Sequence, residues 1–362
     1  MVRLLKVDRW FLWSVLSLLI VGVFFFYSAS ASLLSKSGAN YYGSIFNHLI
    51  IGCLGGLLVC YFFSKFNYLI FRKLATLGYI VSFVLTALTL TPLGVNYNGA
   101  NRWLDFGLFT FQPSELLKVT TIIFVAFLLT EFHHKIKTWW GITLWLIPLI
   151  LNSILLLLQP DKMTVIILGL VLFIMYIVAG GNWKFWLPLV LLGIIATFVI
   201  VWQTPYALNR ITGFADCNNH LQGQCWHTTQ SKIALGAGGL WGRGYNQSLQ
   251  KYGPLPEAQS DSIFSIIGEE LGFVGCGLVI LLFISFAWSG LRLVRRTEGF
   301  GSLIILGAVL LPVFQAIINL YSMSGVIPIL GEHLPFISQG GTAVFFELAS
   351  AGIVMGISRY RS

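Results

Sequence analysis

Charged residues are what this 362-residue chain most clearly lacks. Asp, Glu, Lys and Arg make up only 10% of it, whereas a soluble domain carries about 25%. Hydrophobic residues account for 57% of the chain. This composition excludes an ordinary soluble globular protein and predicts a polytopic membrane protein of the all-α class.

Several catalytic signatures are also missing. The sequence has no Ser/His/Asp constellation, no nucleotide-binding glycine fingerprint and no metalloprotease motif. The glycine-rich segment 236–244 lacks the flanking strand and helix of a phosphate-binding loop. Acidic residues number 13 against 22 basic ones, for a net charge of +9. We attribute this excess to membrane orientation and to contact with anionic lipid headgroups, and not to nucleic-acid binding.

Apolar runs long enough to cross a bilayer, which needs roughly 20 residues, recur along the chain. We expect about ten transmembrane helices in a single domain, 1–362, with one large extracytoplasmic loop at about 204–262. The expected spans are 10–30, 46–63, 74–92, 114–132, 140–159, 163–180, 185–203, 263–290, 300–321 and 341–357.

The placement of Lys and Arg predicts the orientation, because cytoplasmic connections collect positive charge. Alternate connections, counted from the N-terminus, hold 14 of the 22 basic residues in short segments. These residues are Arg3, Lys6, Arg9, Lys65, Arg72, Lys73, Lys135, Lys137, Lys184, Arg292, Arg295, Arg296, Arg359 and Arg361. We therefore expect a multi-pass protein of the bacterial cytoplasmic (inner) membrane with both termini in the cytoplasm.

The N-terminal segment has two interpretations. Arg3 to Arg9, the apolar run after them and the sequence Ala29-Ser-Ala31 imitate a signal peptide with its cleavage site. The apolar run, 10–27, is longer than a usual signal core, which favours an uncleaved first helix. Cleavage would not invert the rest of the topology.

The five cysteines divide by environment. Cys53, Cys60 and Cys276 fall in apolar runs and are expected to be reduced packing residues. Cys217 and Cys225 lie in the outward loop, where they can form a disulfide. Two unpaired thiols, or a Cys/His zinc site, are the alternatives, although the spacing fits no standard zinc pattern.

The densest group of charges lies where a water-exposed loop is expected to lead into the fourth span. Arg102, Asp105, Glu115 and Lys118 fall within 17 residues. Glu115 in a first helical turn complements the helix dipole, and Lys118 three residues later lies on the same face. The pair is either a plain intrahelical ion pair or part of a site.

Three carboxylates mark the start of the eighth span. Asp261 stands at its outer mouth, either as a charge that favours the helix dipole or as a site residue. Glu269 and Glu270 lie deeper and need partners. Arg102 and Lys118 can supply them if the fourth and eighth spans border an outward, water-filled cavity. Such a site suits an anionic amphiphile, for example a lipid with a pyrophosphate headgroup.

Several motifs, in order along nearly the whole chain, resemble the SEDS family, which comprises the FtsW, RodA and SpoVE proteins. They are residues 99–105 (GANRWLD) with 111–115 (FQPSE), 159–161 (QPD), 230–244, 255–272, 324–328 and 335–341. The segment 255–272 is closer to the division-type FtsW than to the elongation-type RodA.

The resemblance implies a ten-helix SEDS bundle that polymerises lipid II into β-1,4 glycan strands outside the cytoplasmic membrane. Undecaprenyl pyrophosphate would be released, in cell division or cell-shape maintenance, and a class B penicillin-binding protein would be the transpeptidase partner. Asp261 would be the essential acidic residue, as base or as metal ligand, with Arg102, Glu115 and Lys118 as polar cavity residues. Arg210 begins a stretch that resembles the family's outer loop. A divalent cation, Mg or Mn, is a further expectation.

The chain departs from the family pattern in places. Lys162 and Met163 replace the usual residues after 159–161, and Ser262 follows Asp261 where Phe is usual. The usual Ser-Tyr-Gly-Gly-Ser is replaced at 338–342 by Ser-Gln-Gly-Gly-Thr, and Glu347 is not a family feature.

Two other functions fit the same charge map. A lipid II flippase would also need a polar cavity, but with a path that opens alternately to both faces of the membrane. A non-catalytic scaffold that recruits a transpeptidase would need neither the polar cavity nor such a path. The motif residues gather at the outer side, which favours polymerisation at that surface.

Overall fold

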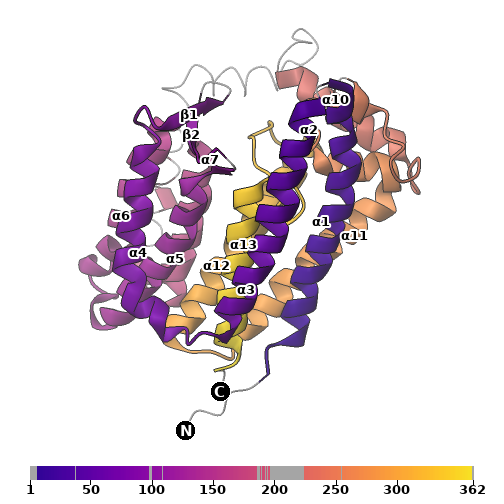
Figure 1. Ribbon diagram of the computed structural model, residues 1–362. Helices are drawn as coiled ribbons and strands as arrows, with labels where there is room; N and C mark the ends of the chain where they lie inside the picture. Colours follow the sequence, from indigo (N-terminus) through magenta and orange to yellow (C-terminus); the bar gives the residue numbers. More distant parts are fainter. Residues whose placement is uncertain are drawn as a thin grey trace.

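Long apolar helices joined by short connections build the protein, as Figure 1 shows for the computed structural model. The structure describes residues 6–36, 38–97, 100–107, 109–185, 224–253 and 255–360, with the single positions 188, 190, 191, 193 and 195. The all-α class is confirmed.

Eight helical segments within the described residues are long and apolar enough to cross a membrane. Six of them are α1 (Arg9–Lys36), α4 (Leu69–Leu88), α5 (Pro113–Glu131), α6 (Trp139–Leu158), α11 (Ile263–Val294) and α12 (Gly299–Met323). The others are α13 (Gly341–Ser358) and a continuous helix formed by α2 (Gly38–Ile45), a π-helical segment (Phe46–Gly55) and α3 (Gly56–Lys65).

The predicted count of ten spans is matched only in part. A ninth apolar helix, α7 (Lys162–Val178), has 17 residues and coincides with the predicted span 163–180. The predicted span 185–203 lies largely outside the described residues, so the tenth crossing stays a prediction. The chain is a multi-pass membrane protein.

The interior of the bundle is centred on α12. This helix packs against α5, α7, α11 and α13, and α13 packs in turn on α3. Helix α13 also packs on the π-helical segment, where Gly52 allows close approach, since a Cβ there would lie 2.9 Å from the carbonyl oxygen of Gly341. Such close approach of small residues is how membrane helices commonly associate.

Helix α11 is bent near its N-terminal end. Gly272 has φ +66° and ψ −159°, a conformation that glycine adopts without steric cost. A Cβ at this position would also lie 2.4 Å from the backbone nitrogen of Gly242. The bend separates a short half-helix, 263–271, from the longer membrane-crossing part, and it sets the direction in which residue 261 is presented.

A small antiparallel sheet lies at the end of the bundle opposite the start of α1 and the end of α13 (Figure 1). Its strands are β1 (Gly94–Tyr97), β2 (Ala100–Asp105) and β3 (Thr110–Phe111). Leu104 pairs with Gly94 on one side and Phe111 on the other. The sequence indicated a plain loop here, whereas the chain forms a hairpin that leads directly into α5.

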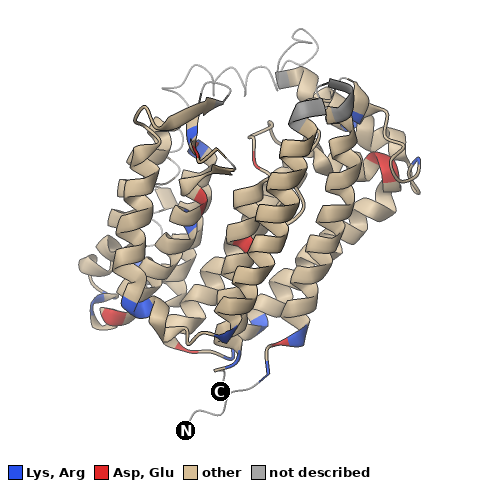
Figure 2. Ribbon diagram, in the orientation of Figure 1, with Lys and Arg blue, Asp and Glu red and all other residues tan. Residues whose placement is uncertain are grey.

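Lys and Arg gather at the other end, beside the start of α1 and the end of α13 (Figure 2). Helix α10 (Gln224–Gly238) lies at the sheet end and packs against α11. The two ends of the bundle therefore differ in charge as the Lys and Arg pattern in the sequence predicts.

Candidate functional site

Asp261 occupies a tightly folded segment just before α11. Ser262 precedes the first helical residue, and its hydroxyl donates to the carbonyl oxygen of Pro256 at 2.9 Å. The backbone nitrogen of Ser262 donates to the carbonyl of Glu257 at 3.1 Å. His227 of α10 contacts the same hydroxyl at 2.6 Å. The position of Asp261 at the head of the helix is confirmed, and it is fixed from several sides.

The loop between α12 and α13, residues 324–340, holds the Asp261 segment. The Ser338 hydroxyl donates to the carbonyl of Ser260 at 2.6 Å. Gln339 donates from its backbone nitrogen to the carbonyl of Gln259 at 2.8 Å. We call residues 324–340 the inner loop, because they lie within the bundle and buried residues recur along them.

Asn319 of α12 ties the inner loop to Asp261. Its Nδ2 donates to the carbonyl of Asp261 at 2.8 Å and to the carbonyl of Glu332 at 2.7 Å. Gly331, with φ +76°, lies against the acid, since a Cβ there would be 3.7 Å from Oδ2 of Asp261. One amide therefore fixes the spacing between Asp261 and the segment that carries Glu332.

The predicted pairing of Glu115 with Lys118 is confirmed. Both residues are buried, at 6% and 3% exposure, and Nζ of Lys118 lies 2.8 Å from Oε2 of Glu115. Pro113 at the helix start and the three-residue spacing place both side chains on one face of α5. A buried ion pair adds little stability by itself, because removing two charges from water is costly.

Arg102 does not contact the carboxylates. Its guanidinium donates to the carbonyl oxygens of Gln159 at 2.9 Å and Pro160 at 2.7 Å. It thus ties β2 to the turn between α6 and α7. The next residue, Asp161, caps α7 by accepting from the Thr164 hydroxyl at 3.0 Å and the Thr164 backbone nitrogen at 3.4 Å.

Glu332, which no sequence motif singled out, completes the group of charges. Burial, followed by the charge of Asp161, raises the pKa of Glu332 to about 7, and the charges of Lys118 and His333 oppose this only in part. Glu115 also raises it. We call Glu115, Lys118, Asp161 and Glu332 the central cluster. The sequence feature that marks Glu332 is its position next to His333 in an otherwise apolar segment.

Glu347, which had no evident partner in the sequence, is paired with His333. Nε2 of His333 lies 3.1 Å from Oε1 of Glu347, and the backbone nitrogen of Phe336 donates to Oε2 at 2.7 Å. Burial lowers the pKa of His333, but the hydrogen bond to Glu347 and the charge of Glu347 outweigh it and raise the pKa to about 9. The pair anchors the inner loop to α13.

Glu269 and Glu270 do not share a cavity with Arg102 and Lys118, and that expectation is wrong. Nζ of Lys251 donates to Oε1 of Glu270 at 2.8 Å and to Ser28 of α1 at 2.8 Å. The reason is that the loop before α11 folds back and brings its own cation to these acids.

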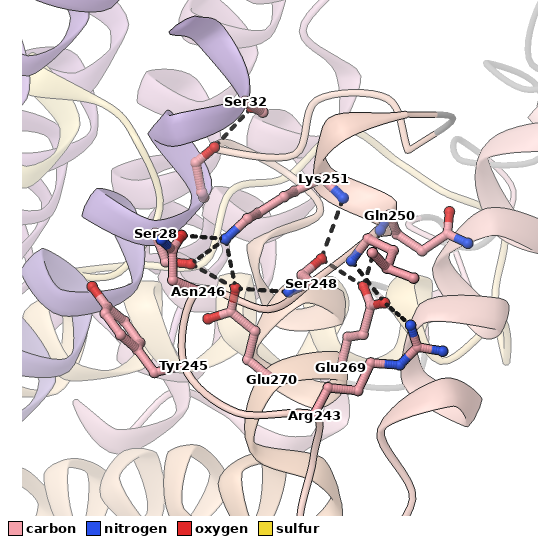
Figure 3. A network of polar contacts seen from close by, with 12 residues as sticks. Ser28, Ser32, Arg243, Tyr245, Asn246, Ser248, Gln250, Lys251, Glu269 and Glu270 are labelled. Carbon is pink, nitrogen blue, oxygen red and sulfur yellow. Dashed lines mark hydrogen bonds and ion pairs between the residues drawn. The ribbon is translucent and has the colours of Figure 1, made fainter. Parts of the chain in front are cut away.

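Glu269 is held by the same loop, as Figure 3 shows. It accepts from the Ser248 hydroxyl at 2.5 Å and from the backbone nitrogens of Leu249 at 3.1 Å and Gln250 at 3.3 Å, and Arg243 lies 3.5 Å away. We call this group the outer network, and it fixes the half-helix that follows Asp261. Its members are Ser28, Arg243, Asn246, Ser248, Lys251, Glu269 and Glu270.

Two predicted site features fall wholly or partly outside the described residues. Arg210 lies outside them, and its role stays a prediction. Cys225 is buried and disulfide-bonded, whereas Cys217 lies outside the described residues, so their pairing also stays a prediction. Cys53, Cys60 and Cys276 are free thiols, as expected.

The described part of the chain contains no group of three or more His, Cys, Asp or Glu side chains arranged to hold a metal ion. The side chains within the described ranges therefore form no all-protein metal cage. Mg²⁺ more often binds one or two carboxylates together with substrate phosphates. The predicted divalent cation stays untested, and we assign no chemical step to it.

A multi-pass helical bundle with a buried Glu115–Lys118 ion pair and an acidic residue just before α11 defines a class of membrane protein with charged groups inside its helical bundle. The chain belongs to the FtsW/RodA/SpoVE family, described as cell cycle proteins, whose family model matches residues 9–362.

Curated relatives support this membership. The chain is 32% identical over 348 residues to the stage V sporulation protein E of Bacillus subtilis, covering 95% of each chain. It is 32% identical over 362 residues to a probable peptidoglycan glycosyltransferase FtsW of Trichlorobacter lovleyi, covering 98% of this chain and 94% of the relative.

Solved structures share the fold. One is a chain from work on the structural coordination of polymerization and crosslinking by a peptidoglycan synthase complex. It has a TM-score of 0.79 and 24% identity over 98% of both chains. Another is the rod shape determining protein RodA of Thermus thermophilus, with a TM-score of 0.71 and 23% identity over 99% of this chain and 98% of that one.

Proposed function

We propose that this chain is a peptidoglycan glycosyltransferase that polymerises lipid II into β-1,4 glycan strands, in cell division or cell-shape maintenance. The observation that carries the proposal is the placement of Asp261 at the head of α11, tied through Asn319 to the loop that reaches the buried central cluster. Family membership and the names of the FtsW relatives support it.

The reaction joins two sugars in one displacement. The 4-hydroxyl oxygen of the acceptor sugar attacks the anomeric carbon of the donor, and the bond from that carbon to the pyrophosphate oxygen breaks. The α-linked donor becomes β-linked, and the electron pair leaves with undecaprenyl pyrophosphate. The acceptor's hydroxyl proton passes to the Asp261 carboxylate. A single inversion needs one positioned base, which is the role we assign to Asp261.

The leaving pyrophosphate gains negative charge as the bond breaks, and Lys118 is the cation we assign to it. A preorganised cation in a site shielded from water stabilises such charge strongly. Glu115 holds the ammonium group in place at 2.8 Å. Arg102 donates to the carbonyl oxygens of the α6–α7 turn, so we assign it a positioning role: it holds β2 against that turn.

We infer that the Lys- and Arg-rich end faces the cytoplasm of a bacterial inner membrane, with both termini on that side. The sheet and the start of α11 would then lie outside, where cell-wall synthesis occurs. A class B penicillin-binding protein is the proposed partner, since a similar fold occurs in a complex that polymerises and crosslinks peptidoglycan.

A polymerisation assay tests the proposal. Labelled lipid II in detergent is incubated with purified protein, with and without the transpeptidase, and products are separated on a gel. We expect glycan polymer from the unchanged protein and none from Asp261→Asn. Glu257→Gln is the matched control, because this exposed acid lies on the same segment.

Three other outcomes would overturn the assignment. Polymer formation by Asp261→Asn at the unchanged rate would remove it as the base. Lipid II transfer across vesicle membranes without polymer would indicate a flippase. Partner binding without either activity would indicate a scaffold.

A further inference from the structure

Glu332 differs from every other buried carboxylate among the described residues. The other four each have a cationic partner within 4 Å, whereas Glu332 has none. These pairs are Asp8 with Arg292, Glu115 with Lys118, Glu269 with Arg243, and Glu270 with Lys251. Glu332 is 7% exposed, and Oε2 accepts one long bond, 3.4 Å, from Gln315. A buried, ionised carboxylate without a cation is costly.

The nearby cations are already engaged. Lys118 pairs with Glu115 at 2.8 Å, and His333 pairs with Glu347 at 3.1 Å. An ionised Glu332 would therefore compete with carboxylates that already hold these cations.

We propose that Glu332 governs binding of the donor pyrophosphate: its neutral form admits this anion beside Lys118, and its ionised form excludes it. The proposal rests on the proposed function and names a residue that determines headgroup affinity. The geometry that supports it is the burial of Glu332 without a cation, its single long bond from Gln315, and the bond from Asn319 that links its carbonyl to that of Asp261.

Like charges repel each other strongly where water is largely excluded. A pyrophosphate beside Lys118 and an ionised Glu332 would repel each other more strongly than in water. A protonated Glu332 removes that repulsion, and its O–H can donate to a phosphate oxygen. Binding of the headgroup is therefore coupled to uptake of a proton by the protein.

The charged groups around Glu332 determine the pH range in which headgroup binding is coupled to proton uptake. Asp161 at the start of α7 and Glu115 of α5 disfavour the ionised form, and Lys118 of α5 and His333 of the inner loop favour it. With burial as the largest cause, the pKa is about 7. Neutral Glu332 prevails below this value and is lost as the pH rises through it.

Steady-state kinetics with lipid II test the proposal. KM and kcat are measured from about pH 6 to about pH 8, below the pKa of about 9 of His333, for the unchanged protein and Glu332→Gln. We expect KM of the unchanged protein to rise above about pH 7, approaching tenfold per pH unit for one linked proton. KM of Glu332→Gln should stay flat across this range. Glu298→Gln, an exposed acid at the opposite end, should keep the unchanged profile.

An equal rise of KM in Glu332→Gln would overturn the inference and leave the proposed function standing. Absence of polymer from the unchanged protein at every pH would instead overturn the proposed function.

A second measurement does not depend on the folding of Glu332→Gln. Lipid II is titrated by calorimetry at pH 7 into Asp261→Asn, which blocks turnover, in two buffers of different ionisation enthalpy. The pyrophosphate of lipid II is esterified at both ends and does not titrate at this pH. We expect uptake of roughly half a proton per bound headgroup. Uptake of none would overturn the inference.

Discussion

The outer network and the central cluster contain the same kinds of residue but differ in how completely their charges are satisfied. In the outer network, Nζ of Lys251 donates to Ser28, Asn246 and Glu270, so all three of its donors are used. In the central cluster, every hydrogen bond described for Nζ of Lys118 goes to Glu115. An ammonium group has three donors, so Lys118 has capacity left for a ligand.

The acids show the same contrast. Glu269 accepts hydrogen bonds from three protein donors and also contacts Arg243. Glu270 pairs with Lys251 through Oε1, whereas its Oε2 has no hydrogen-bond partner. Glu332 has a single long hydrogen bond. Buried charges whose hydrogen bonds are all made by protein groups stabilise a particular structure. Buried charges with unfilled hydrogen-bonding capacity at a proposed reaction centre can bind a charged substrate.

The largest effect should come from removing the cation of the outer network. Lys251→Met leaves Glu270 buried without a counter-charge, which should lower the free energy of unfolding by about 3–5 kcal/mol. Chemical unfolding in detergent measures this. Lys137→Met, at an exposed position, should change it by about 0.5 kcal/mol or less. An unchanged stability for Lys251→Met would mean that the network is not structural.

Removing the cation of the central cluster should affect catalysis. Lys118→Met should reduce the rate of polymerisation roughly 10²–10³-fold, because the leaving pyrophosphate loses its cation. The rate is measured at saturating lipid II on protein shown to be folded by gel filtration. A rate close to that of the unchanged protein would contradict the role given to Lys118.

A smaller effect should follow from cutting the link between Asp261 and the inner loop. Asn319→Leu removes two hydrogen bonds and leaves two carbonyls without this donor, at a cost of about 1–3 kcal/mol. If Asn319 positions the base, kcat should fall while KM for lipid II changes little. A change confined to KM would argue that the amide shapes the binding site instead.

Part of this site follows from the sequence. The Glu115–Lys118 pair is local, so helical spacing is enough to predict it. The place of Asp261 follows from where an apolar run begins. Among the described residues, the eight helices long enough to cross a membrane and the shorter apolar helix α7 follow from apolar length.

Other features depend on contacts between distant segments. Lys251 reaches Glu270 because the loop folds back onto α1, and no local pattern encodes that return. The inner loop places Glu332 in the central cluster only through tertiary contacts such as the hydrogen bond from Asn319. The hairpin at 94–105 is not evident from the sequence because its strands are short and polar residues interrupt them.

The most direct test compares two double substitutions, each of which removes one buried ion pair completely. Glu115→Gln with Lys118→Met acts on the central cluster, and Glu270→Gln with Lys251→Met acts on the outer network. Glycan polymer per folded molecule is measured from lipid II for both proteins. We expect the first protein to fold and make no polymer, and the second to make polymer but unfold more easily. Polymer from the first and none from the folded second would contradict it.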